Sequence, residues 1–186
     1  MTSDRNRVCP VELAGSLDSR LRRVLQNPHK ILSPFVREGM SVLEVGCGPG
    51  FFSVELASRV GKTGTVVCAD IQEGMLQRLK ERIAGTQLEQ RIQLVKCEVD
   101  SINVSGEFDF VLLFYMVHEV PKKDRFFRQL RSLLKANGSI LLVEPKLFHV
   151  SKEEFRRTTQ LANEAGFVPT PGPKLAFSWS AILTIT

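Results

Sequence analysis

The chain has 186 residues, of which 43% are hydrophobic and 24% charged, and its formal net charge is +5. These fractions exclude a fibrous or disordered protein, and the length suits a single domain over residues 1–186. No segment approaches the roughly 20 apolar residues of a membrane span, and the first residues lack an apolar stretch of signal-peptide length, so we expect a cytoplasmic protein.

Residues 1–38 predict a short helical cap. Leu13, Leu17 and Leu21 fall on one helical face, which Val24 and Leu25 extend. The pair Asn27-Pro28 then interrupts this helix before a second short one. We expect residues 39–186 to form the core of the domain.

From residue 42 onward, short apolar runs alternate with amphipathic stretches, which is typical of parallel strands joined by crossover helices. The predicted strands cover residues 41–45, 65–70, 91–96, 108–115 and 139–144. The predicted helices cover residues 50–60, 72–84, 122–135 and 151–165. The segment between Glu98 and Phe108 is too short and too poor in helix formers for a helix, so it predicts a loop.

The segment between Pro121 and Asn137 carries six basic residues and one acid, a balance that equals the net charge of the chain. Apolar residues such as Phe126 and Leu130 recur there at helical spacing, so we expect a helix with a solvated basic face. A patch that recruits an anionic partner such as nucleic acid is the alternative.

Three prolines, Pro169, Pro171 and Pro173, predict a break before a β-rich run over residues 176–186. We expect this run to close the sheet as an antiparallel C-terminal strand. The predicted fold is therefore α/β: a Rossmann-like, doubly wound, mostly parallel sheet with an antiparallel C-terminal strand and a short helical N-terminal cap.

The most informative motif follows the first predicted strand, where Glu44 precedes three alternating glycines, Gly46, Gly48 and Gly50. Glycines allow a tight turn and let a ligand lie against the main chain, and the following helix offers unpaired N–H groups. The motif predicts a site for a nucleoside derivative.

A dinucleotide fingerprint is the competing interpretation, because Asp70 stands twenty residues past Gly50. That fingerprint requires a third glycine at position 51, where this chain has Phe51. The carboxylate of Glu44 would also repel a pyrophosphate but could pair with an ammonium group. The turn therefore favours a positively charged ligand.

At these residues the sequence resembles the class I S-adenosylmethionine-dependent methyltransferases, whose first motif has the form acid-x-Gly-x-Gly-x-Gly. The resemblance implies that the turn from Gly46 through Cys47 and Gly48 to Gly50 holds the methionine part of the cofactor. It further implies that Asp70 takes the two ribose hydroxyls. Ile71 and Met75 would border the adenine, and S-adenosylhomocysteine would be the product.

The same resemblance extends over residues 39–144 and is closest to small-molecule methyltransferases of the quinone-biosynthesis type. It places Glu98 and Val99 at the adenine, although the family more often has Gly-Asp-Ala there. Phe114 is expected at the cofactor, where the fourth strand ends. A histidine often stands at the position of His118 in that group.

We expect a small-molecule methyl acceptor. For a hydroxyl acceptor, His118 could remove the proton and Tyr115 could orient the group. An amine or thiolate acceptor would need neither residue. A structural role for His118 remains open.

A zinc motif at His118-Glu119 would need a second histidine where Lys122 stands, so no metal is expected. Cysteines at Cys9, Cys47, Cys68 and Cys97 contain no CxxC pair and predict free thiols.

The (Asn/Asp)-Pro-Pro-(Tyr/Phe) tetrad of DNA amino methyltransferases is missing after the fourth strand, which argues against nucleic acid as the substrate. A cofactor-binding protein without catalysis and a nicotinamide-dependent oxidoreductase remain as alternatives, and a homodimer is left open.

Overall fold

The computed structural model describes residues 26–146 and 150–185. The helix predicted between Leu13 and Leu25, most of the predicted cap and Cys9 lie outside the described residues. The part of the cap that is described includes a short helix, α3 (Pro28–Leu32), whose first turn is capped by the Asn27 side chain. This is the second short helix that the sequence predicts.

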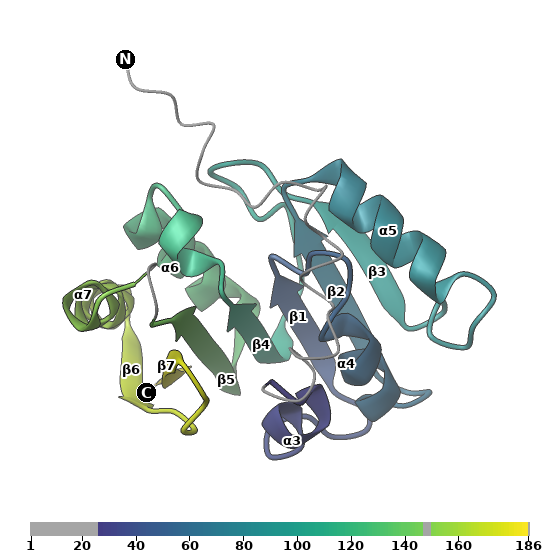
Figure 1. Ribbon diagram of the computed structural model, residues 1–186, viewed down its shortest axis with the longest axis horizontal. Helices are drawn as coiled ribbons and strands as arrows, with labels where there is room; N and C mark the ends of the chain where they lie inside the picture. The colour runs from purple at the N-terminus through teal and green to yellow at the C-terminus, as the bar shows by residue number, and fades with distance from the viewer. Residues whose placement is uncertain (1–25, 147–149, 186) are drawn as a thin grey trace.

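The described chain forms a seven-stranded sheet with helices on both faces (Figure 1). The strand order is β3-β2-β1-β4-β5-β7-β6; β1 to β5 run parallel, and β7 runs antiparallel to β5 and β6. The strands are β1 (Ser41–Val45), β2 (Thr65–Asp70), β3 (Ile92–Lys96), β4 (Phe108–Phe114), β5 (Leu134–Pro145), β6 (Phe167–Pro171) and β7 (Ser178–Ile185). The predicted Rossmann-like sheet with its antiparallel last strand is confirmed.

Two hydrophobic cores lie on the two faces of this sheet. Successive side chains of a strand point to opposite faces, so Val42 of β1 belongs to one core and Leu43 to the other. The first core is covered by α3, α4 (Ser53–Arg59) and α5 (Glu73–Ile83). The second is covered by α6 (Lys123–Leu133) and α7 (Lys152–Glu164). The carboxyl ends of β1 to β5 therefore meet at one edge, between the two helix layers.

Strand β6 was not predicted from the sequence. Pro169 and Pro171 predicted a break, but both lie in β6, at the outer edge of the sheet. Because the two prolines are two residues apart, their backbone nitrogens face the same side of the strand. An edge strand has one side where no N–H donor is needed. Proline there also leaves that edge a poor template for another strand.

The boundary between α6 and β5 also differs from the prediction. The helix ends at Leu133, and Asn137-Gly138, interpreted as the helix stop, lies inside β5. The pairing of β5 with β4 is irregular there, with a register shift between Phe108 and Phe110. A Cβ atom on Gly138 would lie 2.9 Å from the Phe108 carbonyl oxygen, so this glycine permits close approach of the strands.

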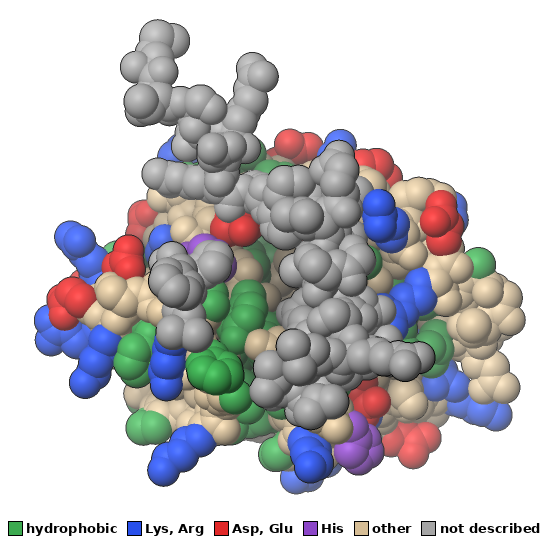
Figure 2. Space-filling view, viewed as in Figure 1, with side chains coloured by type: hydrophobic (Ala, Val, Ile, Leu, Met, Phe, Trp, Pro, Cys, Tyr) green, Lys and Arg blue, Asp and Glu red, His purple; other side chains and the backbone are tan. Residues whose placement is uncertain are grey.

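The basic segment forms α6 with its apolar side chains inward, as predicted. Phe127 and Leu130 are fully buried, whereas Arg128 is exposed and paired with Asp124 at 2.6 Å. Figure 2 shows basic and acidic side chains interspersed along the edge of the molecule near α7. In residues 26–146 and 150–185, no helix is long and apolar enough to cross a membrane.

Removing the N-cap of α7 is expected to destabilise the fold. The Ser151 hydroxyl accepts from the Glu154 N–H at 3.2 Å, and the Glu154 carboxylate accepts from the Ser151 N–H at 2.7 Å. Ser151→Ala should lower the free energy of unfolding in urea by about 1 kcal/mol. Ser58→Ala, at an exposed position inside α4, is the control and should cost less. Equal losses would show that the cap contributes nothing.

Candidate functional site

The glycine-rich turn connects β1 to α4. Gly46 and Gly48 have positive φ values of 73° and 53°, which glycine adopts without steric penalty. The N–H groups of Gly46 and Cys47 donate to the Ala69 carbonyl of β2 at 2.8 and 3.2 Å. A Cβ atom on Gly48 would meet nothing within 4 Å, and Gly48 borders a cavity. The turn therefore presents bare main chain to a ligand.

Gly50 has a different position. Its φ is 87°, and a Cβ atom there would lie 2.4 Å from the Leu79 side chain of α5. It is not among the residues that line the cavity. The third glycine of the motif therefore allows α5 to pack against the turn.

Glu44 stands beneath the turn and is 3% exposed. The Ser53 hydroxyl, at the start of α4, donates to its Oε2 atom at 2.5 Å. A buried carboxylate is costly unless it is hydrogen-bonded or paired with a cation. Because Glu44 also lines the cavity, it can offer its charge to an ammonium group.

Cys47 lies beside this carboxylate and is 4% exposed. A hydrogen bond with the Cys68 thiol, together with burial, raises the pKa of the Cys47 thiol well above its usual value. Cys47 therefore contributes a neutral thiol to the cavity wall.

Asp70 ends β2, and its carboxylate organises the turn. It accepts from the Gly48 N–H and the Gln72 N–H, both at 2.9 Å. Burial raises the pKa of this carboxyl, and the two backbone donors offset part of that rise. Ile71 and Met75 follow it along the cavity wall, with Ile71 at the exposed rim.

One end of the cavity is closed by the loop that follows β3. Glu98 and Val99 line this wall, and Val99 is 63% exposed. The loop is braced by α6, since the Gln129 side chain bonds to the Asp100 carbonyl and the Ile102 N–H, both at 3.0 Å. The predicted crossover loop is thus held in place without a helix of its own.

Aromatic rings line the other end. The rings of Phe52 and Phe114 lie 4.4 Å apart, and those of Phe114 and Tyr115 lie 4.6 Å apart. The Tyr115 hydroxyl lies 2.6 Å from both Ser178 Oγ and Gln26 Nε2. Ser178 donates to the Ala176 carbonyl, so Tyr115 donates to Ser178 and accepts from Gln26. The proton of Tyr115 is therefore engaged within the protein.

His118 lies just behind this end, in the short 3₁₀ turn η3 (Val117–Glu119). Its Nδ1 atom lies 2.6 Å from the Glu144 carboxylate, which is 2% exposed and also accepts the Val117 N–H at 2.9 Å. Burial alone would lower the pKa of His118, but the hydrogen bond and charge of Glu144, aided by Glu119, raise it. His118 is not among the residues that line the cavity.

The structure brings most of the predicted site residues to one cavity of about 330 Å³. Eleven of the thirteen line it: Glu44, Gly46, Cys47, Gly48, Asp70, Ile71, Met75, Glu98, Val99, Phe114 and Tyr115. Gly50 and His118 do not line it. The roles of all thirteen residues in binding and catalysis stay predictions.

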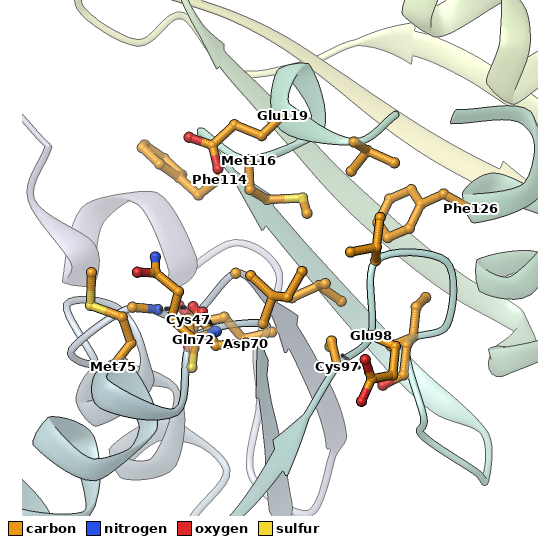
Figure 3. A pocket seen from close by; sticks show the side chains of 18 of the residues that line it. Cys47, Asp70, Gln72, Met75, Cys97, Glu98, Phe114, Met116, Glu119 and Phe126 are labelled. Carbon is orange, nitrogen blue, oxygen red and sulfur yellow. Dashed lines mark hydrogen bonds between the residues drawn. The ribbon is translucent and has the colours of Figure 1, made fainter. Parts of the chain in front are cut away.

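Several lining residues were missed, among them Gln72, Met116 and Glu119 (Figure 3). Gln72 follows Asp70 by two residues, and the other two flank His118, so proximity to the motifs was the available signal. Phe51 and Phe52 are buried in the core and also line the cavity.

The donor set fits S-adenosylmethionine. Carboxylates at Glu44 and Asp70 suit an ammonium group and ribose hydroxyls, and apolar side chains such as Met75 suit an adenine ring. In residues 26–146 and 150–185, the basic residues that line the cavity are Arg125, on α6, and Lys122, its N-cap. The described residues of the turn itself therefore contribute no lining cation that could hold a diphosphate.

Strand order and turn together define a Rossmann-like domain of the methyltransferase type. A family model described as a methyltransferase domain matches residues 36–175, so the chain belongs to this methyltransferase family. S-adenosylmethionine is the cofactor that the family implies.

Known proteins show the same similarity. The ubiquinone/menaquinone biosynthesis C-methyltransferase UbiE of Haemophilus ducreyi is 30% identical over 133 residues, 71% of this chain and 49% of that protein. The chain spans about half the length of the curated relatives it matches.

Two solved structures share the fold. A SAM dependent methyltransferase from Aquifex aeolicus has a TM-score of 0.86 and 24% identity, covering 96% of this chain and 100% of that one. A TehB-like SAM-dependent methyltransferase from Corynebacterium glutamicum has a TM-score of 0.73 and 13% identity, covering 95% and 100%.

Alanine substitutions at Gly48 and Gly50 should separate the effect of packing from that of backbone strain. Gly50→Ala forces a Cβ into Leu79, so it should lower the free energy of unfolding by about 2–5 kcal/mol, combining overpacking with left-handed strain. Gly48→Ala suffers the strain alone and should cost about 1–2 kcal/mol. Urea unfolding of the two variants without cofactor measures both. A loss at Gly48 as large as that at Gly50 would contradict the packing role.

Asp70 should control cofactor affinity. Asp70→Ala is expected to weaken binding of S-adenosylhomocysteine in calorimetry by about 1.5–3 kcal/mol, the scale of charge-assisted hydrogen bonds. Hydroxyl donors need the ionised carboxylate, and its pKa is raised. On acidification, affinity should therefore begin to fall at a higher pH than it would for an aspartate with the ordinary pKa of about 3.9. Asp124→Asn, on the exposed side of α6, is the control; unchanged affinity in Asp70→Ala would remove Asp70 from the site.

Proposed function

We propose that the protein transfers a methyl group from S-adenosylmethionine to a small-molecule acceptor. The observation that carries this proposal is the single cavity that joins the glycine-rich turn, its two carboxylates and an aromatic wall. The similarity to a C-methyltransferase of quinone biosynthesis supports a small, partly apolar acceptor. When bound, the cofactor supplies a methyl group already activated on a sulfonium.

The chain's own contribution is alignment and exclusion of water. Glu44 takes the ammonium group, Asp70 takes the ribose hydroxyls, and Glu98 with Val99 borders the adenine. The aromatic end, with Phe114 and Tyr115, is left for the acceptor. Tyr115 acts there through its ring, because its hydroxyl is bonded to Gln26 and Ser178.

His118 is proposed as the group that receives the proton of a hydroxyl acceptor. Glu144 fixes the ring through Nδ1, and the Nε2 atom lies 3.9 Å from Glu119, which lines the cavity. The ring is thus oriented by a buried carboxylate, the usual arrangement for a histidine base.

A cofactor-binding protein without catalysis is the second candidate, since the turn and carboxylates serve binding alone. Calorimetry with S-adenosylmethionine and NADH, followed by an acceptor panel assayed for S-adenosylhomocysteine, separates the candidates. Binding of the first cofactor with turnover supports a methyltransferase, and binding without turnover supports the second candidate. Binding of NADH alone would reject both.

Buried thiols at Cys47, Cys68 and Cys97 support a reducing, cytoplasmic location.

The pH profile should report the proton acceptor. His118 accepts a proton only when neutral, and its pKa is raised, so kcat/KM for a hydroxyl acceptor should rise with pH to a plateau, with a midpoint above the ordinary histidine value of about 6.5. His118→Ala should abolish this titration and lower the rate about a hundredfold. His29→Ala, an exposed histidine paired with Glu55, should leave the profile unchanged. A His118→Ala rate within a fewfold of the parent would assign the residue a structural role.

A further inference from the structure

Glu119 adds a carboxylate to the cavity that the proposed function leaves without a role of its own. Figure 3 shows its side chain close to those of Phe114 and Met116, across the cavity from Cys47 and Gln72. It ends the turn η3, and its side chain is 24% exposed. Glu119 therefore belongs to the wall of the cavity rather than to the outer surface.

The position of Glu119 within the cavity sets it at the acceptor end. If Asp70 and Glu98 hold the nucleoside, as the proposed function requires, the region bounded by Phe114, Tyr115 and Glu119 remains for the acceptor. The inference drawn here rests on that assignment.

A network of polar contacts that ends at the buried Glu144 lies behind Glu119. Its Oε1 atom lies 3.9 Å from His118 Nε2, and His118 Nδ1 lies 2.6 Å from Glu144. Glu144 is held in turn by the backbone N–H groups of Val117 and His118, at 2.9 and 3.2 Å. The turn that carries Glu119 is therefore anchored to the end of β5, and its carboxylate has a defined place.

The charges around the cavity are unevenly distributed. Glu44 and Glu119 both line the cavity, Glu44 beneath the glycine-rich turn and Glu119 beside Phe114 (Figure 3). Among the described residues, the lining cations are Arg125, on α6, and Lys122, its N-cap; Arg125 pairs with Asp100 at 2.9 Å on the opposite wall. Glu119 is therefore the acidic side chain that Figure 3 places beside the ring of Phe114.

We infer that Glu119 selects the acceptor by charge and hydrogen bonding. It accepts a hydrogen bond from a neutral hydroxyl or a protonated amine on a small aromatic acceptor. A carboxylate or phosphate near the reacting group is repelled, because like charges a few ångströms apart in a partly enclosed site interact strongly.

The test measures binding rather than turnover. Wild-type protein saturated with S-adenosylhomocysteine is titrated with 4-hydroxybenzylamine, 4-hydroxybenzyl alcohol and 4-hydroxybenzoate, which share one ring and differ in charge. The amine and the alcohol should bind at least about tenfold more tightly than the benzoate. Glu119→Gln, which keeps the shape and removes the charge, should reduce this preference by about tenfold.

Asp100→Asn is the matched control, because it removes a charge from the opposite wall of the same cavity. Its preference among the three compounds should equal that of the wild type. Equal binding of amine and benzoate, an unchanged preference in Glu119→Gln, or binding of none of the three would overturn the inference. Charge preference without methyl transfer to any acceptor would instead reject the proposed methyltransferase function and leave the role of Glu119 intact.

Discussion

The structure depends on how the parallel sheet accommodates negative charge at one edge. Each of its five parallel strands has an acid near its carboxyl end or in the segment that follows: Glu44, Asp70, Glu98, Glu119 and Glu144. The carboxyl ends of parallel strands meet at the same edge, where open α/β sheets bind ligands. Like charges gathered there would destabilise the fold unless each is offset locally.

The groups that compensate each carboxylate differ from strand to strand, and these differences define the site. A hydroxyl serves Glu44, two backbone N–H groups serve Asp70, and an imidazole with two backbone N–H groups serves Glu144. The carboxylates of β1 and β2 face the cavity, whereas that of β5 is committed to the protein and is only 2% exposed. A positively charged ligand completes the compensation in the cavity, which is the physical reason that this edge suits a sulfonium cofactor.

The sequence was sufficient for the elements whose patterns depend on neighbours along the chain. The bounds of β1 and β2 were predicted to the residue, because both strands are buried on two faces and end at a glycine or an acid. It failed where the outcome depends on distant partners. The prolines of β6 are tolerated because, in the part of the chain that the structure describes, that strand pairs with β7 on one side only, and Gly138 is required by the nearness of β4.

The same division applies to the candidate site. Glu44, Asp70 and the first two glycines could be predicted, because their chemistry follows from spacing along the chain. The motif predicts that Gly50 contacts the ligand. In the structure Gly50 instead packs against Leu79, because the turn brings α5 against it. Glu119 was considered only as part of a metal motif. Its place in the cavity depends on Glu144, which is 25 residues further along the chain, at the end of β5.

Helix α6 shows how a surface feature can serve the interior. Its basic residues resemble an anion-binding patch in sequence, yet Arg125 pairs with Asp100, and Gln129 holds the loop after β3. That loop replaces a crossover helix, so without such bracing one wall of the cavity would lack support. The segment most suggestive of an external partner therefore stabilises the internal site, and the positive charge of the chain is no argument for a nucleic-acid substrate.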